Sequence, residues 1–170
     1  VPVPDLSNFI AQGYSEASGA PYSMGLIRNH YVGRTFIKPV QQFRDESVKQ
    51  KFNPLAGFFT GKRVVLVDDS IVRGTTLRKL VRMIRSAGAR EVHVRIGSPP
   101  VKFPCYYGID TPTYEELIIN QISQEQLRIH MEADSLKYLE LEDLLGIVEN
   151  GSQFCAACFD GRYPVGTPIP

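Results

Sequence analysis

Two adjacent carboxylates, followed by a loop rich in hydroxyl groups, are the residues of this chain best suited to chemistry. Asp68 and Asp69 come directly after the apolar residues 64–67, and residues 70–76 read Ser-Ile-Val-Arg-Gly-Thr-Thr. Glycine, hydroxyls and an arginine in one loop can bind a phosphate group. Carboxylates repel phosphate, but a sugar diol or a Mg²⁺ ion gives them a role beside it. The alternative is a plain helix start that Asp68, Asp69 and Ser70 merely cap.

The segments around this loop predict a strand, a helix and a second strand. Residues 64–67 are uniformly apolar, which is typical of a strand buried on both faces of a parallel sheet. Thr75 or Thr76 can cap a helix that ends near Gly88, and residues 91–96 alternate as a strand does. Apolar residues recur in the helix at Leu77, Leu80, Val81 and Ile84. The loop therefore lies at the carboxyl end of a strand and at a helix N-terminus, where anions bind.

This segment carries a family resemblance that extends along the chain. Residues 64–76 resemble the 5-phosphoribosyl-1-pyrophosphate (PRPP) motif of type I phosphoribosyltransferases, in the wording typical of glutamine PRPP amidotransferases. Residues 28–37 resemble the start of that family's flexible active-site loop, and residues 99–110 and 155–164 resemble the cysteine-bearing segments of its iron-sulfur subgroup. The resemblance implies an α/β type I phosphoribosyltransferase fold, with a mostly parallel sheet flanked by helices and a long flexible active-site loop.

The resemblance also implies roles for individual residues. A Mg²⁺ ion would be held by Ser7, Asp68 and Asp69. The PRPP-binding residues would be Asp68, Asp69, Ser70, Ile71, Val72, Arg73, Gly74, Thr75 and Thr76.

Residues 5–7 resemble the pyrophosphate loop of the family, with a helix after it that ends near Gly19. Leu6 departs from the small or hydroxyl-bearing residue that the family commonly places there. A plain helix cap at Asp5, Ser7 or Asn8 explains the same letters.

Residues 22–27 predict a strand, and more than thirty residues without a strong periodicity then precede Val64. By resemblance this stretch is a basic flap that closes over the polyphosphate, with Arg34, Lys49 and Lys51 as its catalytic cations. The alternative is a solvated hairpin with a short helix at residues 44–51.

Three cysteines remain, at positions 105, 155 and 158. The Cys-x-x-Cys pair fits a redox dithiol, half a zinc site or part of an iron-sulfur cluster, and the spacing alone favours zinc. The resemblance implies instead that Cys105, Cys155 and Cys158 are ligands of a 4Fe-4S cluster whose fourth ligand lies upstream of this chain. The histidines show no metal-ligand spacing, and His93 and His130 are expected to be structural.

Further elements are predicted toward the C-terminus. Thr113 with Glu116 forms a capping box for a helix through Ile119, and Ser123 with Gln126 predicts a second helix. Residues 135–139 predict a strand, and residues 142–148 an apolar-faced helix. Its core residues are expected to be Leu144, Leu145 and Val148.

Composition predicts an ordinary globular domain. The chain has 170 residues, 43% hydrophobic and 22% charged, with a net charge of +1, so nothing demands nucleic acid as a partner. It has neither an apolar run near the roughly 20 residues of a membrane span nor a signal peptide, which favours the cytoplasm. The sequence begins without Met and in what reads as the end of a strand. We therefore expect one transferase domain over residues 1–170, excerpted from a longer polypeptide that also carries an N-terminal glutaminase domain and the start of the transferase domain.

The expected function is the amidophosphoribosyltransferase reaction, the first committed step of purine synthesis. Ammonia from glutamine would displace pyrophosphate from Mg-PRPP and give 5-phosphoribosylamine. The resemblance also implies purine nucleotide inhibitors and a homo-oligomer. Three alternatives are a non-catalytic PRPP-binding regulator, which Leu6 favours, a metal-cluster or redox module, and a salvage enzyme acting on a free base.

Overall fold

A computed structural model describes residues 1–31, 51–109, 111 and 113–166 of the chain. Its centre is a parallel sheet of β3 (Arg63–Asp68), β4 (Glu91–Ile96) and β5 (Ser135–Tyr138), in the order β3-β4-β5. The first residues of the chain run parallel to β3 on its other side, where Val3 N–H donates to Val67 O at 2.8 Å and Val67 N–H donates to Val1 O at 2.9 Å. The strands predicted at residues 64–67, 91–96 and 135–139 are confirmed, and so is the predicted α/β class.

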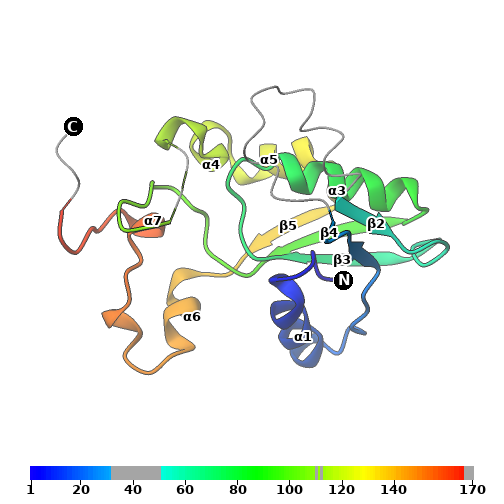
Figure 1. Ribbon diagram of the computed structural model, residues 1–170, viewed down its shortest axis with the longest axis horizontal. Coiled ribbons are helices and arrows are strands. Elements are labelled where there is room, and N and C mark those ends of the chain that lie inside the picture. Colours follow the sequence, from blue (N-terminus) through cyan, green and yellow to red (C-terminus); the bar gives the residue numbers. More distant parts are fainter. Residues whose placement is uncertain (32–50, 110, 112, 167–170) are drawn as a thin grey trace.

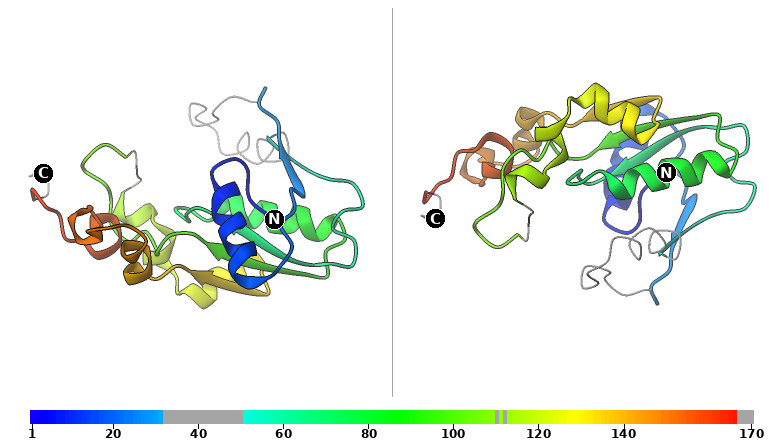
Figure 2. Two further views of the ribbon diagram at one scale, coloured as in Figure 1. Left: turned by 90° about the horizontal axis from the view of Figure 1, so that it is seen from below. Right: turned by 90° about the horizontal axis from the view of Figure 1, so that it is seen from above.

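Helices cover both faces of this sheet (Figures 1 and 2). α3 (Thr75–Ser86) connects β3 to β4 and packs with α5 (Gln124–Met131) on one face, whereas α1 (Ser7–Ser18) lies on the other, against β3. The main hydrophobic core lies between the sheet and the α3–α5 layer. Its fully buried residues include Leu66, Leu80, Ile84, Val94, Leu127 and Met131.

The helix between β3 and β4 begins and ends close to the predicted positions. Gly88, with a φ of 97°, follows its end as predicted. The predicted threonine cap is wrong, because Gly74 is the N-cap and Thr75 and Thr76 are the first two helical residues. The chain enters this helix through a φ of 71°, a left-handed conformation that glycine adopts without strain.

A second, two-stranded sheet pairs β1 (Leu26–Arg28) with β2 (Phe52–Pro54) in antiparallel fashion. The strand predicted at residues 22–27 is therefore wrong in its extent. Leu26 lies opposite Pro54, and beyond this pair the N–H of Leu55 still donates to Gly25 O at 2.9 Å, so residues 22–24 are the part of the predicted strand that lies outside the sheet. This sheet joins the two ends of the long segment whose cations were predicted to act on PRPP. Two of these cations, Arg34 and Lys49, lie outside the described residues. The same holds for the predicted helix at residues 44–51, of which only Lys51 is described.

The predicted capping box at Thr113 and Glu116 is present, but it begins a short 3₁₀-helix, η2 (Tyr114–Glu116). Leu117 is extended and fully buried, and it separates η2 from α4 (Ile118–Gln121). The prediction of one helix through Ile119 is therefore corrected, because burying Leu117 breaks the turn. The box at Ser123 and Gln126 begins α5 as predicted.

The C-terminal part contains α6 (Leu141–Gly146), η3 (Gly151–Gln153) and α7 (Ala157–Asp160), and it projects to one side of the sheet (Figure 1). The predicted core role of the helix at 142–148 is wrong. Leu144 and Leu145 are only partly buried and Val148 is 44% exposed, because α6 packs against η3 instead of the sheet.

Candidate functional site

Asp68 lies at the carboxyl end of β3, where two distant segments of the chain meet. Ser7 Oγ donates a hydrogen bond to Asp68 Oδ1 at 3.0 Å, and the N–H of Asp69 donates to the same oxygen at 3.0 Å. Ser7 is itself fully buried at the start of α1. The predicted pyrophosphate loop and the predicted carboxylate pair therefore form one site.

The electrostatics of this pair favour a bound cation. Burial, followed by the charge of Asp69, raises the pKa of Asp68 to about 7. A cation beside these groups would favour the ionised carboxylate, and the hydroxyl of Ser7 with two carboxylates is an oxygen donor set that suits Mg²⁺. The donor set therefore fits this metal. Within the described ranges, no three His, Cys, Asp or Glu side chains form a group that could hold a metal ion.

The loop after the carboxylates turns from β3 into α3. The N–H of Ser70 donates to Asp69 Oδ1 at 2.7 Å, and the side chain of Ile71 is buried and anchors the loop in the core. Thr75 and Thr76 are exposed at the start of the twelve-residue α3, whose first N–H groups have no partner within the helix. This arrangement offers hydroxyl and N–H donors together with the positive end of a helix dipole to an anion.

Gly74 is required at this point for two reasons. Its φ is 71°, and an added Cβ would lie 3.3 Å from Leu127 Cδ1. α5 therefore packs directly against the backbone of the loop.

Arg73 is turned toward the η2 segment. Its Nη2 atom lies 3.0 Å from Glu116 Oε1, and both side chains are nearly half exposed. Sequence reasoning assigned Arg73 to the phosphate and missed Glu116 as its partner. In the sequence, Glu116 could be recognised only as part of a capping box. Its pairing with Arg73 could not be recognised, because 43 positions separate the two residues.

The pyrophosphate loop has a second partner that sequence reasoning missed. Arg28 Nη1, at the end of β1, lies 2.8 Å from Asp5 Oδ2. The peptide bond between Pro4 and Asp5 is cis, and Leu6 is 75% exposed. Leu6 is the N-cap of α1 and makes no side-chain capping bond, so the predicted caps at Asp5, Ser7 and Asn8 are wrong. The loop is held by Asp5 and Ser7, whose side chains bond to other segments.

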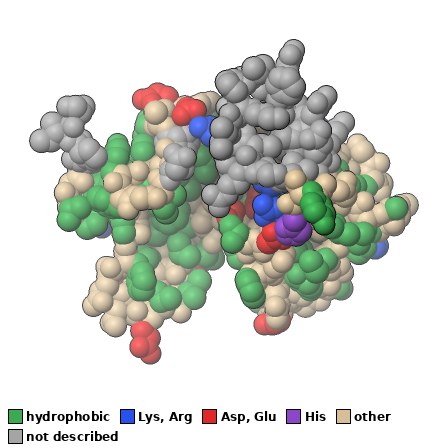
Figure 3. Space-filling model, viewed as in Figure 1, with side chains coloured by type: hydrophobic (Ala, Val, Ile, Leu, Met, Phe, Trp, Pro, Cys, Tyr) green, Lys and Arg blue, Asp and Glu red, His purple; other side chains and the backbone are tan. Residues whose placement is uncertain are grey.

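Lys51 is the one predicted flap cation among the described residues. It directly precedes β2, where its main-chain oxygen accepts the N–H of Asn29 at 2.8 Å. Its Nζ atom lies 5.6 Å from the ring centre of Phe52. On the face drawn in Figure 3, positively charged, negatively charged and histidine side chains lie close together near the middle of the view.

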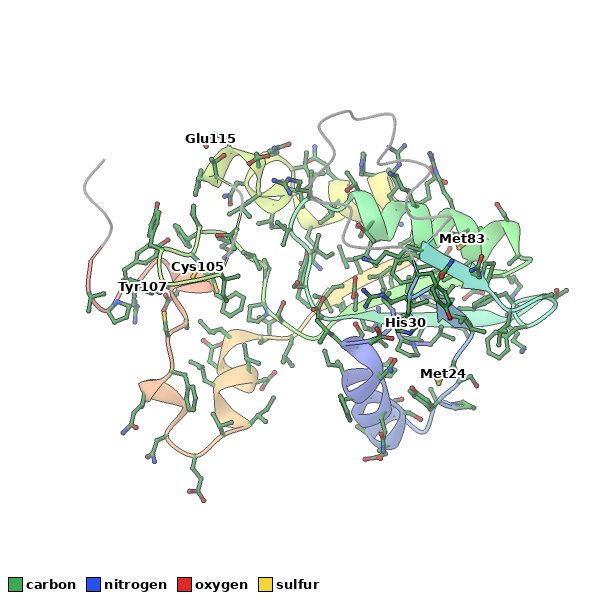
Figure 4. The ribbon with its side chains drawn as sticks, viewed as in Figure 1. Met24, His30, Met83, Cys105, Tyr107 and Glu115 are labelled. Carbon is green, nitrogen blue, oxygen red and sulfur yellow. The ribbon has the colours of Figure 1, made fainter. Side chains whose placement is uncertain are left out.

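Cys105 lies in the segment between β4 and η2, whereas Cys158 lies in α7 and Cys155 just before it; Figure 4 shows Cys105 beside Tyr107 and near α7. The N–H groups of Lys102 and Phe103 donate to the main-chain oxygen of Cys158 at 2.9 and 3.0 Å. Burial, followed by the charges of Cys105 and Cys155, raises the pKa of the Cys158 thiol. The structure thus brings the predicted cluster ligands into one region, with all three thiols free.

Cys105 is the thiol best prepared to act as a thiolate. The N–H of Tyr107 donates to its sulfur at 3.4 Å, and the N–H groups of Tyr107 and Ile109 lower the pKa of the thiol. N–H groups around sulfur are also found at iron-sulfur sites. The chemistry of these donors therefore fits the predicted cluster.

The two histidines expected to be structural occupy secondary-structure elements. His93 lies in β4 with Nδ1 at 2.9 Å from Ser135 Oγ and Nε2 at 3.0 Å from Glu91 Oε2. His130 is exposed in the last turn of α5.

Comparisons with known proteins place the chain among enzymes. A family model described as phosphoribosyl transferase domain matches residues 16–96. An amidophosphoribosyltransferase from Synechocystis is 53% identical over 167 residues, which are 98% of this chain and 34% of that protein. One from Methanothermobacter thermautotrophicus is 54% identical over 171 residues, with 100% and 36% covered. The solved glutamine PRPP amidotransferase from B. subtilis, complexed with ADP and GMP, has a TM-score of 0.82 and 52% identity, with 96% of this chain and 37% of that chain covered.

The fold, the phosphate loop and these matches define a type I phosphoribosyltransferase domain. The chain belongs to the amidophosphoribosyltransferase family. The family resemblance seen in the sequence is thereby confirmed. The chain spans about a third of the length of the curated relatives that it matches. In the described part of the chain, every helix is too short or too polar to span a lipid bilayer.

Proposed function

We propose that this chain is the phosphoribosyl-transfer part of an amidophosphoribosyltransferase. It binds Mg-PRPP at the carboxyl end of β3, and ammonia attacks the anomeric carbon of the ribose. A C–N bond forms as the C–O bond to pyrophosphate breaks, and the nitrogen then loses a proton to give 5-phosphoribosylamine. The observation that carries the proposal is the bond of Ser7 to Asp68 at the mouth of the phosphate loop.

The chain's own residues bind and orient in this reaction. Asp68 and Asp69 accept hydrogen bonds from the ribose hydroxyls, and the start of α3 with Thr75 and Thr76 holds the 5-phosphate. Ser7, Asp68 and Asp69 would hold Mg²⁺, which neutralises charge on pyrophosphate when bound. Arg34, Lys49 and Lys51 would add flap cations around the leaving group.

Other parts of the reaction belong to longer relatives and are carried over as proposals. Ammonia would come from glutamine in an N-terminal glutaminase domain of the same polypeptide. The B. subtilis neighbour was solved with ADP and GMP, which suggests purine nucleotides as inhibitors of this protein as well. A homo-oligomer and a cytoplasmic location complete the proposal; some plant relatives are named as chloroplastic.

We further propose that Cys105, Cys155 and Cys158 bind a 4Fe-4S cluster, with the fourth ligand outside this chain. The N–H donors around Cys105 and the common location of the three thiols support this assignment. Such a cluster would serve structure or oxygen sensing, and the transfer reaction needs no electron from it.

Calorimetric titration with PRPP, with and without Mg²⁺, tests the transfer function. A pyrophosphate-release assay with ammonium chloride follows on the same sample, with glutamine as a parallel nitrogen source. We expect Mg²⁺-dependent binding and release with ammonia but not with glutamine. Binding without release would instead identify the non-catalytic PRPP-binding regulator, which the exposed Leu6 favours. Absence of binding would contradict the assignment of residues 70–76 as a phosphate-binding loop.

A further inference from the structure

The carboxylate of Glu116 makes contacts with two separate segments of the chain. Its Oε2 atom accepts the N–H of Thr113 at 3.3 Å in the capping box of η2, while Oε1 lies 3.0 Å from Arg73 Nη2. One carboxylate therefore joins the start of η2 to the middle of the phosphate loop. Glu116 lies two residues before Ile118, which makes its own contact with the loop.

A second connection runs beside the ion pair. The N–H of Ile118 donates to Val72 O at 3.0 Å, and the buried Leu117 anchors this stretch in the protein. The Ile118 side chain also lies within 4 Å of the space that a Cβ on Gly74 would fill. Three consecutive loop residues, 72–74, are therefore each in contact with residues 116–118 or close to them.

We propose that Glu116 is a positioning residue of the phosphate loop. By holding Arg73 while Ile118 holds Val72, it keeps the loop in the conformation that presents the N–H groups at the start of α3. This inference rests on the proposed function, since it assigns the loop to phosphate. It gives Arg73 a role that differs from direct contact with the ligand.

The two possible roles of Arg73 predict opposite effects of a Glu116 substitution on PRPP affinity. If Arg73 binds phosphate directly, Glu116 competes for the guanidinium, and Glu116→Gln should tighten PRPP binding. If the pair positions the loop, the same substitution should loosen the loop and weaken binding. Glutamine keeps the capping box, because its side-chain oxygen still accepts the N–H of Thr113. The substitution therefore removes the negative charge that pairs with Arg73 and keeps the capping box.

Glu115→Gln is the matched control. Glu115 is the preceding residue in η2, is exposed and lies at the outer edge of the molecule (Figure 4). Its substitution removes the same negative charge one position away, so any general gain in attraction for anionic PRPP is shared by both variants. The difference between the two variants measures what is particular to the Glu116 carboxylate, and combining Glu116→Gln with a substitution of Arg73 isolates their contact.

The experiment is a double-mutant cycle on the whole chain, with Glu116→Gln, Arg73→Gln and both together, titrated with PRPP and Mg²⁺. Relative to Glu115→Gln, we expect each single variant to weaken PRPP binding about two- to fivefold, the range of an exposed ion pair. The double variant should bind as the single ones do. Equal binding by Glu116→Gln and the control, or a loss on Arg73→Gln that persists in full when residue 116 is Gln, would overturn the proposal.

Amide hydrogen exchange of the ligand-free chain gives a readout that is independent of PRPP. We expect the Ile118 amide to exchange about two- to fivefold faster in Glu116→Gln and Arg73→Gln, and at the wild-type rate in Glu115→Gln. Unchanged exchange in all variants would overturn the positioning role. If the wild-type chain shows no PRPP binding, the proposed function fails, and this measurement alone decides whether Glu116 positions the loop.

Discussion

At the scale of single residues, the candidate site contains groups that lower the stability of the protein without a ligand. Asp68 is partly buried beside a second carboxylate, and its pKa is raised to about 7 by that burial and by the charge of Asp69. Gly74 adopts a left-handed conformation at a point where an added Cβ would lie 3.3 Å from Leu127 Cδ1 of α5. Both features favour ligand binding at a cost in folding stability, which is typical of functional sites.

Asp68→Asn should separate binding from stability. We expect PRPP binding in the presence of Mg²⁺ to weaken by about 1.5–3 kcal/mol, the range for hydrogen bonds to a charged group. The free energy of unfolding without ligand or metal should rise at pH 8, because the substitution removes a buried charge and its repulsion from Asp69. Calorimetry and urea unfolding measure the two quantities. A variant that binds PRPP as the wild type does would contradict the site assignment.

Gly74→Ala should cost more than the same change at Gly57. Gly57 has a φ of 70° and nothing within 4 Å of an added Cβ, so it carries only the backbone penalty of about 1–2 kcal/mol. Gly74→Ala adds contact with Leu127 and Ile118. We expect a larger loss in the free energy of unfolding and a loss of PRPP binding, whereas Gly57→Ala should keep binding. Equal losses in urea unfolding would show that α5 yields easily at this point.

At the scale of elements, local pattern predicted far more than long-range contact. β3, α3, β4 and both capping boxes follow from periodicity and from residues within one turn of each other. The pairs Asp5–Arg28 and Arg73–Glu116 join segments 23 and 43 positions apart, and no local signal marks them. The helix at α6 was misjudged for the same reason, since its apolar spacing says nothing about which element it meets.

Asp134 shows how elements are joined, and it predicts a pH dependence. It precedes β5, accepts the N–H of Val92 in β4 at 2.6 Å and pairs with Arg85 of α3 at 2.7 Å. Burial alone would raise the pKa of Asp134, but the Val92 bond and Arg85 outweigh it and lower the pKa. A carboxyl with a lowered folded-state pKa stabilises the fold above its unfolded pKa of about 3.9, and this contribution is lost as pH falls through the folded pKa.

Asp134→Asn should therefore lower the free energy of unfolding at pH 7 by about 1 kcal/mol, a value reduced because the pair is about one-third exposed. The difference from wild type should shrink as the pH falls below about 4. Glu132→Gln is the control, because Glu132 pairs with Arg82 of the same helix at a more exposed position. Urea unfolding at both pH values measures this. A difference that stays constant with pH would contradict an electrostatic origin.

At the scale of the whole molecule, the cysteine-bearing segments and the phosphate loop are connected through packed residues. Phe103 follows Lys102 at the Cys158 carbonyl and contacts the ring of Tyr114 at 6.1 Å between centroids. Tyr114 begins η2, whose last residue, Glu116, pairs with Arg73. Family resemblance singled out both segments in the sequence, but only the three-dimensional structure shows η2 between them.

Tyr163 secures the far end of this connection, because its hydroxyl donates to the main-chain oxygen of Pro104 at 2.6 Å, next to Cys105. Its ring also packs against those of Tyr106 and Tyr107. Tyr163→Phe keeps the ring and removes the bond, so we expect the C-terminal segment to loosen and Cys158 to react several-fold faster with a thiol reagent, in line with about 1 kcal/mol for one hydrogen bond. Tyr106→Phe is the control and should leave the rate unchanged. Equal rates in the two variants would contradict this prediction. They would show that ring packing alone holds the cysteine-bearing segments together and that the Tyr163 hydroxyl is not needed for it.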